Sequence, residues 1–449
     1  MIARLNSRRL MRITTSLLLT AGLVLSSPII AQSDAPLIVR HGDSSAFPVE
    51  AAAPVTTPES FFSATIGGGA PLPSDTANRP GRTDDRPRVL HTGTNEALFL
   101  NAVVPVVAPQ PVLRPDWMLA HYINVGQGNA TLLEFSCGIA LIDTGGQGDT
   151  GRAELLAYLN KVFARRADLN RTIALVVLTH PHVDHTNGVS VLTGLGAQGF
   201  TIQHIVTNAA ADATDIGFVG QKLLHDYAAS HNTPITLVRN EDITRSDGLT
   251  NDNIDPLKCS PVDPDIRVLW GTDNFGHAWA SNQNNDSVVV RVDFGQSSFL
   301  FTGDLQEAAQ PEFLQSYVRN PDIIKADVYE VGHHGSRNGT TAALLQVIKP
   351  EIAVISAGNP ADKEPGYSAY DFGHPNKVAI DFLSDPSFGV TKTRPPGSFA
   401  VGLKGKAPNS TVPPTYEMET ISKAIFATGW DGDIVIAASA SGEKIVQTK

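Results

Sequence analysis

The pattern of hydrophobic and polar positions becomes regular at Trp117, and from there the chain alternates between expected strands and helices. Residues 152–163 place three leucines, a valine and a phenylalanine on one face of a helix. Residues 173–180 form a continuous apolar run, which fits a strand buried on both sides. Further strands and helices are expected, in chain order, at residues 118–135, 138–146, 202–208 and 221–231.

The second half of this region repeats the same alternation. It begins with a hairpin pattern at 286–304. Pro350 ends the helix expected at 341–350. The remaining elements are a helix at 305–317, a strand at 326–336, a helix at 341–350, a strand at 352–358 and a helix at 377–385. Two halves of alternating strands and helices predict an α/β fold in which sheets are sandwiched between helices.

The two ends of the chain and one late segment lack this order. Residues 32–116 are rich in Ala, Pro, Ser, Thr and Gly, which predicts a linker or loosely ordered arm with one short strand at 98–107. The alternative is a sorting or docking arm. Residues 386–419 are predicted to be a loop insert, and residues 424–446 a closing hairpin with Asp431-Gly432 in its turn region.

The first 31 residues have the pattern of a signal peptide. Four arginines and no acidic residue precede an apolar stretch, which ends on small residues at Ala31. The alternative, a membrane anchor, is less favoured because Ser, Thr, Gly and Pro interrupt the stretch. No later segment is long and apolar enough to span a bilayer. We therefore expect an exported, periplasmic or secreted protein without a membrane span after cleavage.

Charge and cysteine content narrow the chemistry. The formal net charge is −11 over 449 residues, and loss of the leader's arginines makes the chain more acidic still. Nucleic acid is therefore a disfavoured partner, because non-specific binding to it depends on neutralising phosphates. The two cysteines, Cys137 and Cys259, are too few for a thiolate zinc cage. In an oxidising compartment they could pair, although the sequence alone does not bring them together.

Polar clusters follow directly after four of the expected strands. These clusters are Asp143, His180 to His185, Asp304 and the pair His333–His334. In open α/β sheets ligands bind outside the carboxyl ends of strands, so the four clusters are expected to converge. Imidazole and carboxylate ligands suit Zn²⁺, Mn²⁺ or Fe²⁺. Two such cations about 3.5–4 Å apart can activate water and clamp both oxygens of a hydrolysis.

The motif THPHVDH resembles the His-x-His-x-Asp-His signature of the metallo-β-lactamase fold superfamily. The blocks LIDTGG, FTGDL and VGHHGS follow in the order that this superfamily uses. HYINVGQGNATLLEF, NNDSVVVRVDFGQSSFLFTGDL, ADVYEVGHHGS and FATGWDGDIVI resemble its competence-protein (ComEC-like) branch more closely. The resemblance covers 117–449 and implies an αββα sandwich of two mixed β-sheets flanked by helices.

The resemblance also implies a role for each residue of the motifs. His180 and His182 would bind a first metal, Asp184 and His185 a second, with Asp304 bridging and His334 as the last metal histidine. Asp143 would support the ligand loop by hydrogen bonding. The implied cofactors are two divalent metal ions, with Zn²⁺ as the first expectation and Mn²⁺ as the alternative.

The chain departs from the family pattern in three places. The histidine that usually precedes the Gly-Asp block is missing, and Asn285 or Asp286 is expected to stand in. Asn129 occupies a position where the competence branch usually carries Asp. The membrane channel segments of full-length competence proteins have no counterpart in this sequence, so DNA uptake is not implied.

Asp184, His374 and His333 are the residues expected to act in catalysis. For His374 the roles of catalytic acid and of a helix-start residue are equally weighted, and His333 is expected to touch substrate. Ser336 either holds a phosphate oxygen or is a simple turn residue. For His204 and His277 the interpretation as structural residues is preferred to that as metal ligands.

Taken together, the sequence predicts an exported metal-dependent hydrolase that uses a metal-bridging hydroxide. Phosphodiesters, either nucleic acid or a smaller molecule, are the expected substrates. One alternative is an acyl hydrolase of the lactonase or β-lactamase type. The other is a metal-binding module without catalytic activity.

Overall fold

The computed structural model describes residues 38–41, 49–50, 112–146, 148–194, 199–210, 216–362, 368–407 and 409–449. The predicted signal peptide, most of the predicted linker and the strand expected at 98–107 lie outside these residues. In the part of the chain that the structure describes, no helix is long and apolar enough to cross a membrane.

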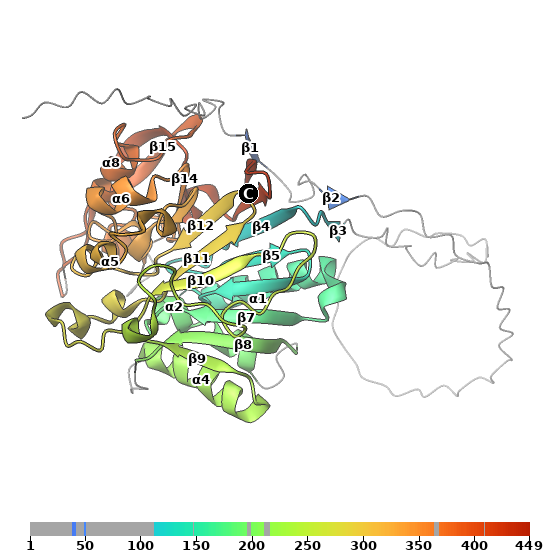
Figure 1. Ribbon diagram of the computed structural model, residues 1–449. Coiled ribbons are helices and arrows are strands. Elements are labelled where there is room, and N and C mark those ends of the chain that lie inside the picture. Colours follow the sequence, from blue (N-terminus) through green and yellow to red (C-terminus); the bar gives the residue numbers. More distant parts are fainter. Residues whose placement is uncertain are drawn as a thin grey trace, which may run out of the picture. The chain divides into compact units, whose positions relative to one another are not determined.

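Strands of the first half of the fold, together with the C-terminal hairpin, form a mixed sheet. Pairing is antiparallel from β18 through β4 and β5 to β6, and parallel from β6 to β9. In spatial order the described strands are β1 (Ile38–His41), β19 (Lys444–Thr448), β18 (Ile434–Ser439), β4 (Trp117–Tyr122), β5 (Thr131–Phe135), β6 (Gly138–Ile142), β7 (Thr172–Leu178), β8 (Thr201–Asn208) and β9 (Ile235–Val238). Strands β4 to β9 are coloured cyan to green in Figure 1.

The second half of the fold forms a second mixed sheet. Its order is β10 (Asp265–Trp270), β11 (Val289–Phe294), β12 (Ser297–Phe301), β13 (Val328–Glu330), β14 (Ile352–Ile355) and β17 (Ile425–Ala427). The first three strands pair antiparallel and the last four pair parallel. Two short antiparallel pairs stand apart, β15 (Thr393–Lys404) with β16 (Thr415–Lys423) and β2 (Val49–Glu50) with β3 (Val112–Leu113).

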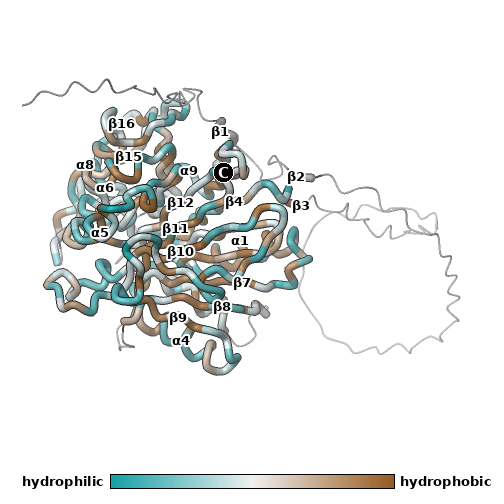
Figure 2. The backbone as a smooth tube through the Cα atoms, viewed as in Figure 1, coloured by the Kyte–Doolittle hydropathy of each residue, from teal (hydrophilic) through white to brown (hydrophobic). Residues whose placement is uncertain are grey.

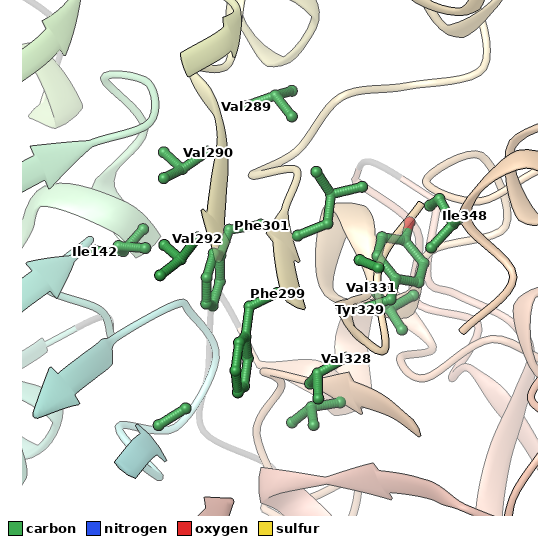
Figure 3. Packing of buried hydrophobic residues seen from close by; sticks show 14 of the residues in the cluster. Ile142, Val289, Val290, Val292, Phe299, Phe301, Val328, Tyr329, Val331 and Ile348 are labelled. Atoms are coloured by element: carbon green, nitrogen blue, oxygen red, sulfur yellow. The ribbon is translucent and has the colours of Figure 1, made fainter. Parts of the chain in front are cut away.

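The two large sheets pack against each other through a shared hydrophobic core. The side chains of β4 alternate, so that Met118, Ala120 and Tyr122 join this core, which also includes residues of β11 and β12. The rings of Tyr122 and Phe301 lie 6.4 Å apart across it. Figure 3 shows Ile142 of the first sheet facing Val292 of the second, and in Figure 2 hydrophobic residues run along the strands. This core fixes the strand ends that carry the polar clusters.

Helices cover the outer faces of both sheets. Leu155, Leu159 and Val162 of α1 pack on the first sheet together with residues of α3 and α4, and residues of α5, α6 and α8 pack on the second. The described helices are α1 (Gly148–Arg165), α2 (Val183–Thr186), α3 (Val189–Thr193), α4 (Ile216–His231), α5 (Gln310–Ser316), α6 (Ala342–Ile348), α7 (Ala369–Phe372), α8 (Lys377–Ser384) and α9 (Thr428–Asp431). Short 3₁₀ helices are η2 (Ala167–Leu169), η3 (Asn240–Asp242), η4 (Ala278–Ser281), η5 (Gln283–Asp286), η6 (Pro321–Ile323) and η7 (Gly332–Gly335). The predicted αββα sandwich is confirmed.

Side-chain caps explain where two of these helices begin. The Thr341 hydroxyl accepts a hydrogen bond from the backbone N–H of Leu344 at the start of α6. The Asn376 side chain likewise accepts from the N–H of Val378 at the start of α8. Such caps satisfy backbone donors that have no partner within the helix. Lys349, in the left-handed conformation, ends α6 immediately before Pro350.

Three sequence expectations were wrong in detail. Residues 386–419 are not a plain loop insert, because they contain β15 and the first part of β16. A register shift between Thr393 and Gly397 accommodates the two prolines that made this segment resemble a loop. Part of the predicted linker, β1, pairs with β19 at the sheet edge.

The third correction concerns the expected closing hairpin at 424–446. Its first part, β17, pairs with β14 in the second sheet, whereas β18 and β19 form a hairpin in the first. Asp431 is the last residue of α9, which connects β17 to β18, and it does not lie in the turn of the β18–β19 hairpin. The chain therefore crosses from one sheet to the other at this point.

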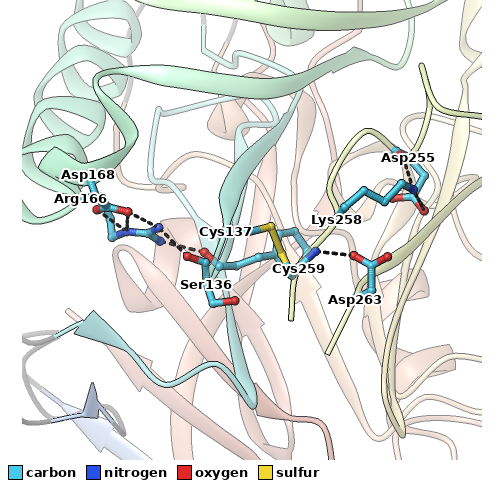
Figure 4. The surroundings of a disulfide bond; sticks show 9 residues. Ser136, Cys137, Arg166, Asp168, Asp255, Lys258, Cys259 and Asp263 are labelled. Carbon is cyan, nitrogen blue, oxygen red and sulfur yellow. Dashed lines mark hydrogen bonds and ion pairs between the residues drawn. A yellow bond between two sulfur atoms is a disulfide. The ribbon is translucent and has the colours of Figure 1, made fainter. Parts of the chain in front are cut away.

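The two cysteines form a disulfide bond (Figure 4). Cys137 lies in the turn between β5 and β6, and Cys259 lies in the segment that leads to β10. Their Cα atoms are 5.2 Å apart and 122 residues separate them in sequence. The bond therefore ties the first sheet to the segment that enters the second.

We expect the double substitution Cys137→Ser/Cys259→Ser to lower the free energy of unfolding by about 3 kcal/mol, because the bond closes a long loop in the unfolded chain. Urea denaturation of wild type and variant measures this difference. Wild-type protein treated with reductant should unfold at the same urea concentration as the variant. An unchanged midpoint in both would contradict the stabilising role.

Candidate metal centre

The four polar clusters converge at the carboxyl ends of β6, β7, β12 and β13. Asp143 follows β6, and His180 is the second residue after β7. Asp304 is the third residue after β12, while His334 follows β13 within η7. Ion-pair distances join side chains from all four strand ends, which confirms the expected convergence.

One potential metal site consists of His180, His185 and Asp304, all buried. One ligand atom from each residue lies within 4.8 Å of the others. His185 Nε2 is 3.2 Å from Asp304 Oδ1, and His180 Nε2 is 3.7 Å from Asp304 Oδ2. Two imidazoles and one carboxylate are a ligand set that suits Zn²⁺ and related cations.

A second potential metal site consists of Asp184, His185 and His334. His334 Nε2 lies 3.2 Å from Asp184 Oδ2 and 3.2 Å from His185 Nε2. It is also 3.5 Å from Asp304 Oδ2. His185 thus belongs to both sites, and the Asp304 carboxylate reaches the second.

His182 lies beside these groups. Its Nδ1 is 3.0 Å from His180 Nε2, and the residue stands at the start of α2. The sequence motif pairs His180 with His182 and Asp184 with His185. In the structure His180 shares its group with His185 instead, and neither group of three includes His182.

The donor atoms of the two sites fit a divalent cation. Asp143 Oδ2 lies 2.7 Å from His185 Nδ1, and the Ser356 carbonyl oxygen lies 2.8 Å from His334 Nδ1. Because each Nδ1–H donates outward, each Nε2 lone pair of a neutral ring faces the cluster. Asp304 Oδ1 is buried and accepts no hydrogen bond from the described residues. A buried carboxylate oxygen of this kind is costly unless a positive charge lies beside it.

The pKa values of the clustered side chains also indicate that the site favours a positive charge. Burial works against a charged His334, but Asp304 and Asp184 outweigh it and raise its pKa to about 10. Burial also opposes a charged His185, whose pKa is nevertheless raised by Asp304 and Asp143. The same histidines hold the pKa of Asp304 well below its usual range despite its burial. A divalent cation would take the place of these protons, since metal ligands must be deprotonated.

Asp143 has the supporting contacts that the sequence predicts for it. Its Oδ1 accepts a hydrogen bond of 2.7 Å from the Thr179 N–H, and its Oδ2 accepts one of 2.8 Å from the Thr179 hydroxyl. Together with the His185 contact, these bonds join the end of β6 to the ligand loop after β7. Asp143 itself has a φ of 55°, which turns its side chain back over that loop.

The structure does not bring Asn285 into the cluster. Its Oδ1 accepts from the Gln306 N–H, and its Nδ2 donates to the Trp279 carbonyl oxygen. Asp286 Oδ1 accepts from the Asp273 N–H. The neighbouring Ser287 approaches the site instead, because its hydroxyl oxygen lies 3.4 Å from His180 Nδ1 and accepts from the Asp304 N–H at 3.0 Å.

Sequence reasoning missed Ser287, Ser356 and Glu330. Glu330 is 2% exposed, and its Oε1 accepts hydrogen bonds from the Ser356 and Thr131 hydroxyls. Burial raises the pKa of its carboxyl to about 7. Through Ser356 it steadies the carbonyl group that orients His334. The available signal was a single acidic residue within the apolar run VYEV.

His333 and His374 lie at the edge of the cluster. His333 Nε2 is 3.8 Å from Asp304 Oδ2, and its Nδ1 is 2.8 Å from Asn338 Oδ1. The His374 ring is 6.0 Å from that of His333 and 6.3 Å from that of His334, between centroids. His374 is buried, and its Nδ1 has no partner among the described residues.

The remaining candidates are Ser336, His277 and His204. Ser336 donates its backbone N–H to the His333 carbonyl oxygen and so belongs to the turn that shapes the ligand loop. His277 is held by Asp273 and Glu312, at 2.9 and 3.2 Å. His204 is a partly buried residue of β8. Neither histidine belongs to a metal-binding group of the described residues.

We expect Asp143→Asn to weaken the binding of a divalent cation about 10–100-fold, the range found when a residue that orients a metal ligand is altered. The amide keeps the shape of the side chain but can no longer accept from both Thr179 and His185. Competition with a chromogenic chelator measures the affinity. Asp168→Asn, at a partly exposed ion pair with Arg166, serves as the control and should bind as wild type.

Comparisons with known proteins identify the family of the chain. The family model of the metallo-beta-lactamase superfamily matches residues 123–359. ComE operon protein 3 of Bacillus subtilis is 25% identical over 321 residues, 67% of this chain and 35% of that protein. Recombination protein 2 of Haemophilus influenzae is 26% identical over 273 residues, 60% of this chain and 28% of that protein.

The chain thus spans 35% or less of the length of these two relatives. Among solved structures, the metallo-beta-lactamase fold protein YhfI from Bacillus subtilis covers 53% of this chain and 85% of its own, at 12% identity and a TM-score of 0.30. Because the family model matches more than half of the 449 residues and spans the HPHVDH, Gly-Asp and GHHG motifs, the chain belongs to the metallo-β-lactamase superfamily.

Proposed function

We propose that the protein is an exported, metal-dependent hydrolase that cleaves phosphodiesters. The observation that carries this proposal is that both potential metal sites lie against one carboxylate, because Asp304 Oδ1 is 3.2 Å from His185 Nε2 and Asp304 Oδ2 is 3.5 Å from His334 Nε2. The two oxygens of Asp304 could be shared by two cations, as in hydrolases with two metals, whereas the one Nε2 lone pair of His185 could bind only one of them. Zn²⁺ suits this ligand set best, and Mn²⁺ is the alternative.

Two cations in these sites would supply a nucleophile from water at neutral pH and offset the negative charge that develops on the phosphate oxygens. The chain's own residues hold the ligands in place for this task. Asp143 orients His185, and the Ser356 carbonyl orients His334. Ser287 supports Asp304 by accepting its backbone N–H. These three ligands are thus each held by a group at a neighbouring strand end, which limits the reorganisation needed during reaction.

His374 and His333, which lie at the edge of the metal cluster, would contact the substrate. Burial, and then the neighbouring His333 and His334, hold the pKa of His374 well below its usual range. Its imidazole is therefore neutral, which does not favour the predicted role as a proton donor to the leaving group. A neutral ring with an unpartnered, buried Nδ1 suits a hydrogen bond to the substrate instead.

The names of relatives favour phosphodiesters as the substrate class. Two relatives have names that refer to recombination or to competence, and recombination acts on DNA, a polymer of phosphodiesters. The net charge of −11, however, gives the protein no long-range attraction for a polyanion. A small phosphodiester therefore fits better than a long nucleic acid.

Export to an oxidising compartment is part of the proposal. A basic and then apolar N-terminal segment supports it, and so does the disulfide between Cys137 and Cys259, since such bonds persist mainly outside the cytosol.

We expect the wild-type protein to bind about two equivalents of Zn²⁺ and His185→Ala to retain less, because the variant loses one of the ligand nitrogens of the cluster. Elemental analysis of purified protein measures the stoichiometry. His231→Ala, at the exposed end of α4, is the control and should match wild type. Full metal content in His185→Ala would contradict the assignment of His185 as a metal ligand.

We expect turnover of bis(p-nitrophenyl) phosphate above background, and none of a lactone or a β-lactam, when the metal sites are filled. His185→Ala protein supplies the background rate for each substrate. Turnover of the lactone alone would favour an acyl hydrolase. Full metal occupancy without turnover of any ester would favour a metal-binding module without catalytic activity.

A further inference from the structure

A cavity of about 300 Å³ is lined by residues from the loops that follow β4 and β14. Three of the segments that line it continue directly into the metal cluster. After Gln127, the chain reaches Asn129, whose N–H donates to the Asp184 carbonyl oxygen at 3.0 Å. Gly358 follows Ser356, which holds His334, and Ala369 accepts from the N–H of His374. The cavity therefore lies where a substrate bound at the cluster would extend.

Gln127 is the residue of this cavity that lacks a partner. It is 5% exposed, and neither its Nε2 nor its Oε1 has a hydrogen-bond partner in the described part of the chain. A buried amide without partners is unfavourable, so its presence in a cavity wall points to a ligand that completes it. The absence of a side chain at Gly358 allows its backbone to lie against that of Gln127, because a Cβ there would be 2.9 Å from the Gln127 backbone nitrogen.

The charges of the lining residues exclude a further phosphate group, besides the one proposed at the metal cluster, as the ligand of this cavity. Glu154 and Asp362 are exposed carboxylates at the rim. Among the described residues of the lining the one cationic side chain is Lys449, which forms an ion pair with Asp433 at 3.3 Å. An anion would therefore meet net negative charge, whereas a neutral group would not.

The polar groups of the lining are those that recognise sugar hydroxyls. The Gln127 amide offers donors and acceptors together, and Asn124 and Asn359 add further amides. Carboxylates accept from hydroxyl groups, which donate as well as accept. The described lining contains no aromatic side chain on which a nucleobase could stack. A pocket of this volume is at the lower end of the range for small-molecule sites.

We propose that this cavity binds the neutral sugar portion of a sugar-phosphate ester whose phosphorus lies at the metal cluster. Gln127 is the specificity-determining residue. The inference rests on the proposed function, because it names the substrate class of the same site.

The test compares p-nitrophenyl diesters that differ only in the second alcohol: ethyl p-nitrophenyl phosphate, glucose 6-(p-nitrophenyl phosphate) and thymidine 5′-(p-nitrophenyl phosphate). Because the leaving group is the same, the ratio of kcat/KM values reports recognition of the second alcohol. We expect the glucose ester to exceed the ethyl ester about tenfold, the contribution of a well-formed neutral hydrogen bond.

Gln127→Leu should bring that ratio close to one, and Gln127→Asn, which keeps an amide, should give an intermediate value. Gln315→Leu, an exposed glutamine on α5, is the matched control and should keep the wild-type ratio. Saturation-transfer NMR with methyl β-glucoside gives a second readout that needs no catalysis. Its signal should appear with wild type and disappear with Gln127→Leu.

The outcomes separate the two proposals. A glucoside signal that depends on Gln127, without turnover of any ester, would support the sugar site and overturn the hydrolase. Turnover with a ratio near one and no glucoside signal would overturn the sugar site and leave the hydrolase standing. Preference for the thymidine ester over the glucose ester would overturn sugar recognition in favour of a nucleobase.

Discussion

The Asp304 carboxylate, buried between the ends of two sheets, is the constraint on which the rest of the site depends. One of its oxygens accepts no hydrogen bond from the described residues, and four histidines each have a ring nitrogen within 4 Å of the carboxylate. Such a group cannot remain charged in the interior unless positive charge lies beside it. The fold meets this need by collecting imidazoles around it, and a pair of divalent cations would meet it more completely.

The surrounding hydrogen bonds explain why these imidazoles face inward. Asp143, Ser356 and Ser287 each belong to a strand end or to the residues directly before or after a strand, and each contacts a ligand. Behind them, Glu330 holds Ser356 from the interior of the second sheet. The packing of the two sheets therefore determines the positions of the ligands. The disulfide adds a covalent link between the first sheet and the segment entering the second.

Local sequence patterns were enough to predict the fold class and the clustering of metal-binding side chains. Strands such as β7 are continuous apolar runs, and the HPHVDH motif lies immediately after one of them. The roles of the individual ligands remain predictions. Long-range pairing was harder to foresee, because residue periodicity does not show which strand will be the neighbour. For this reason the crossing of β17 to the second sheet and the Cys137–Cys259 bond did not follow from the sequence.

Two polar residues were missed for a similar reason. Ser356 contributes a carbonyl oxygen, which every residue possesses, and Gln127 is distinguished only by the absence of partners for its side chain among the described residues.

Anomalous diffraction at the zinc absorption edge, from crystals grown with Zn²⁺, tests the metal centre most directly. Two peaks about 3.5–4 Å apart, both within bonding distance of His185 or Asp304, are predicted. A single peak elsewhere, or none at this cluster, would contradict the two-metal site.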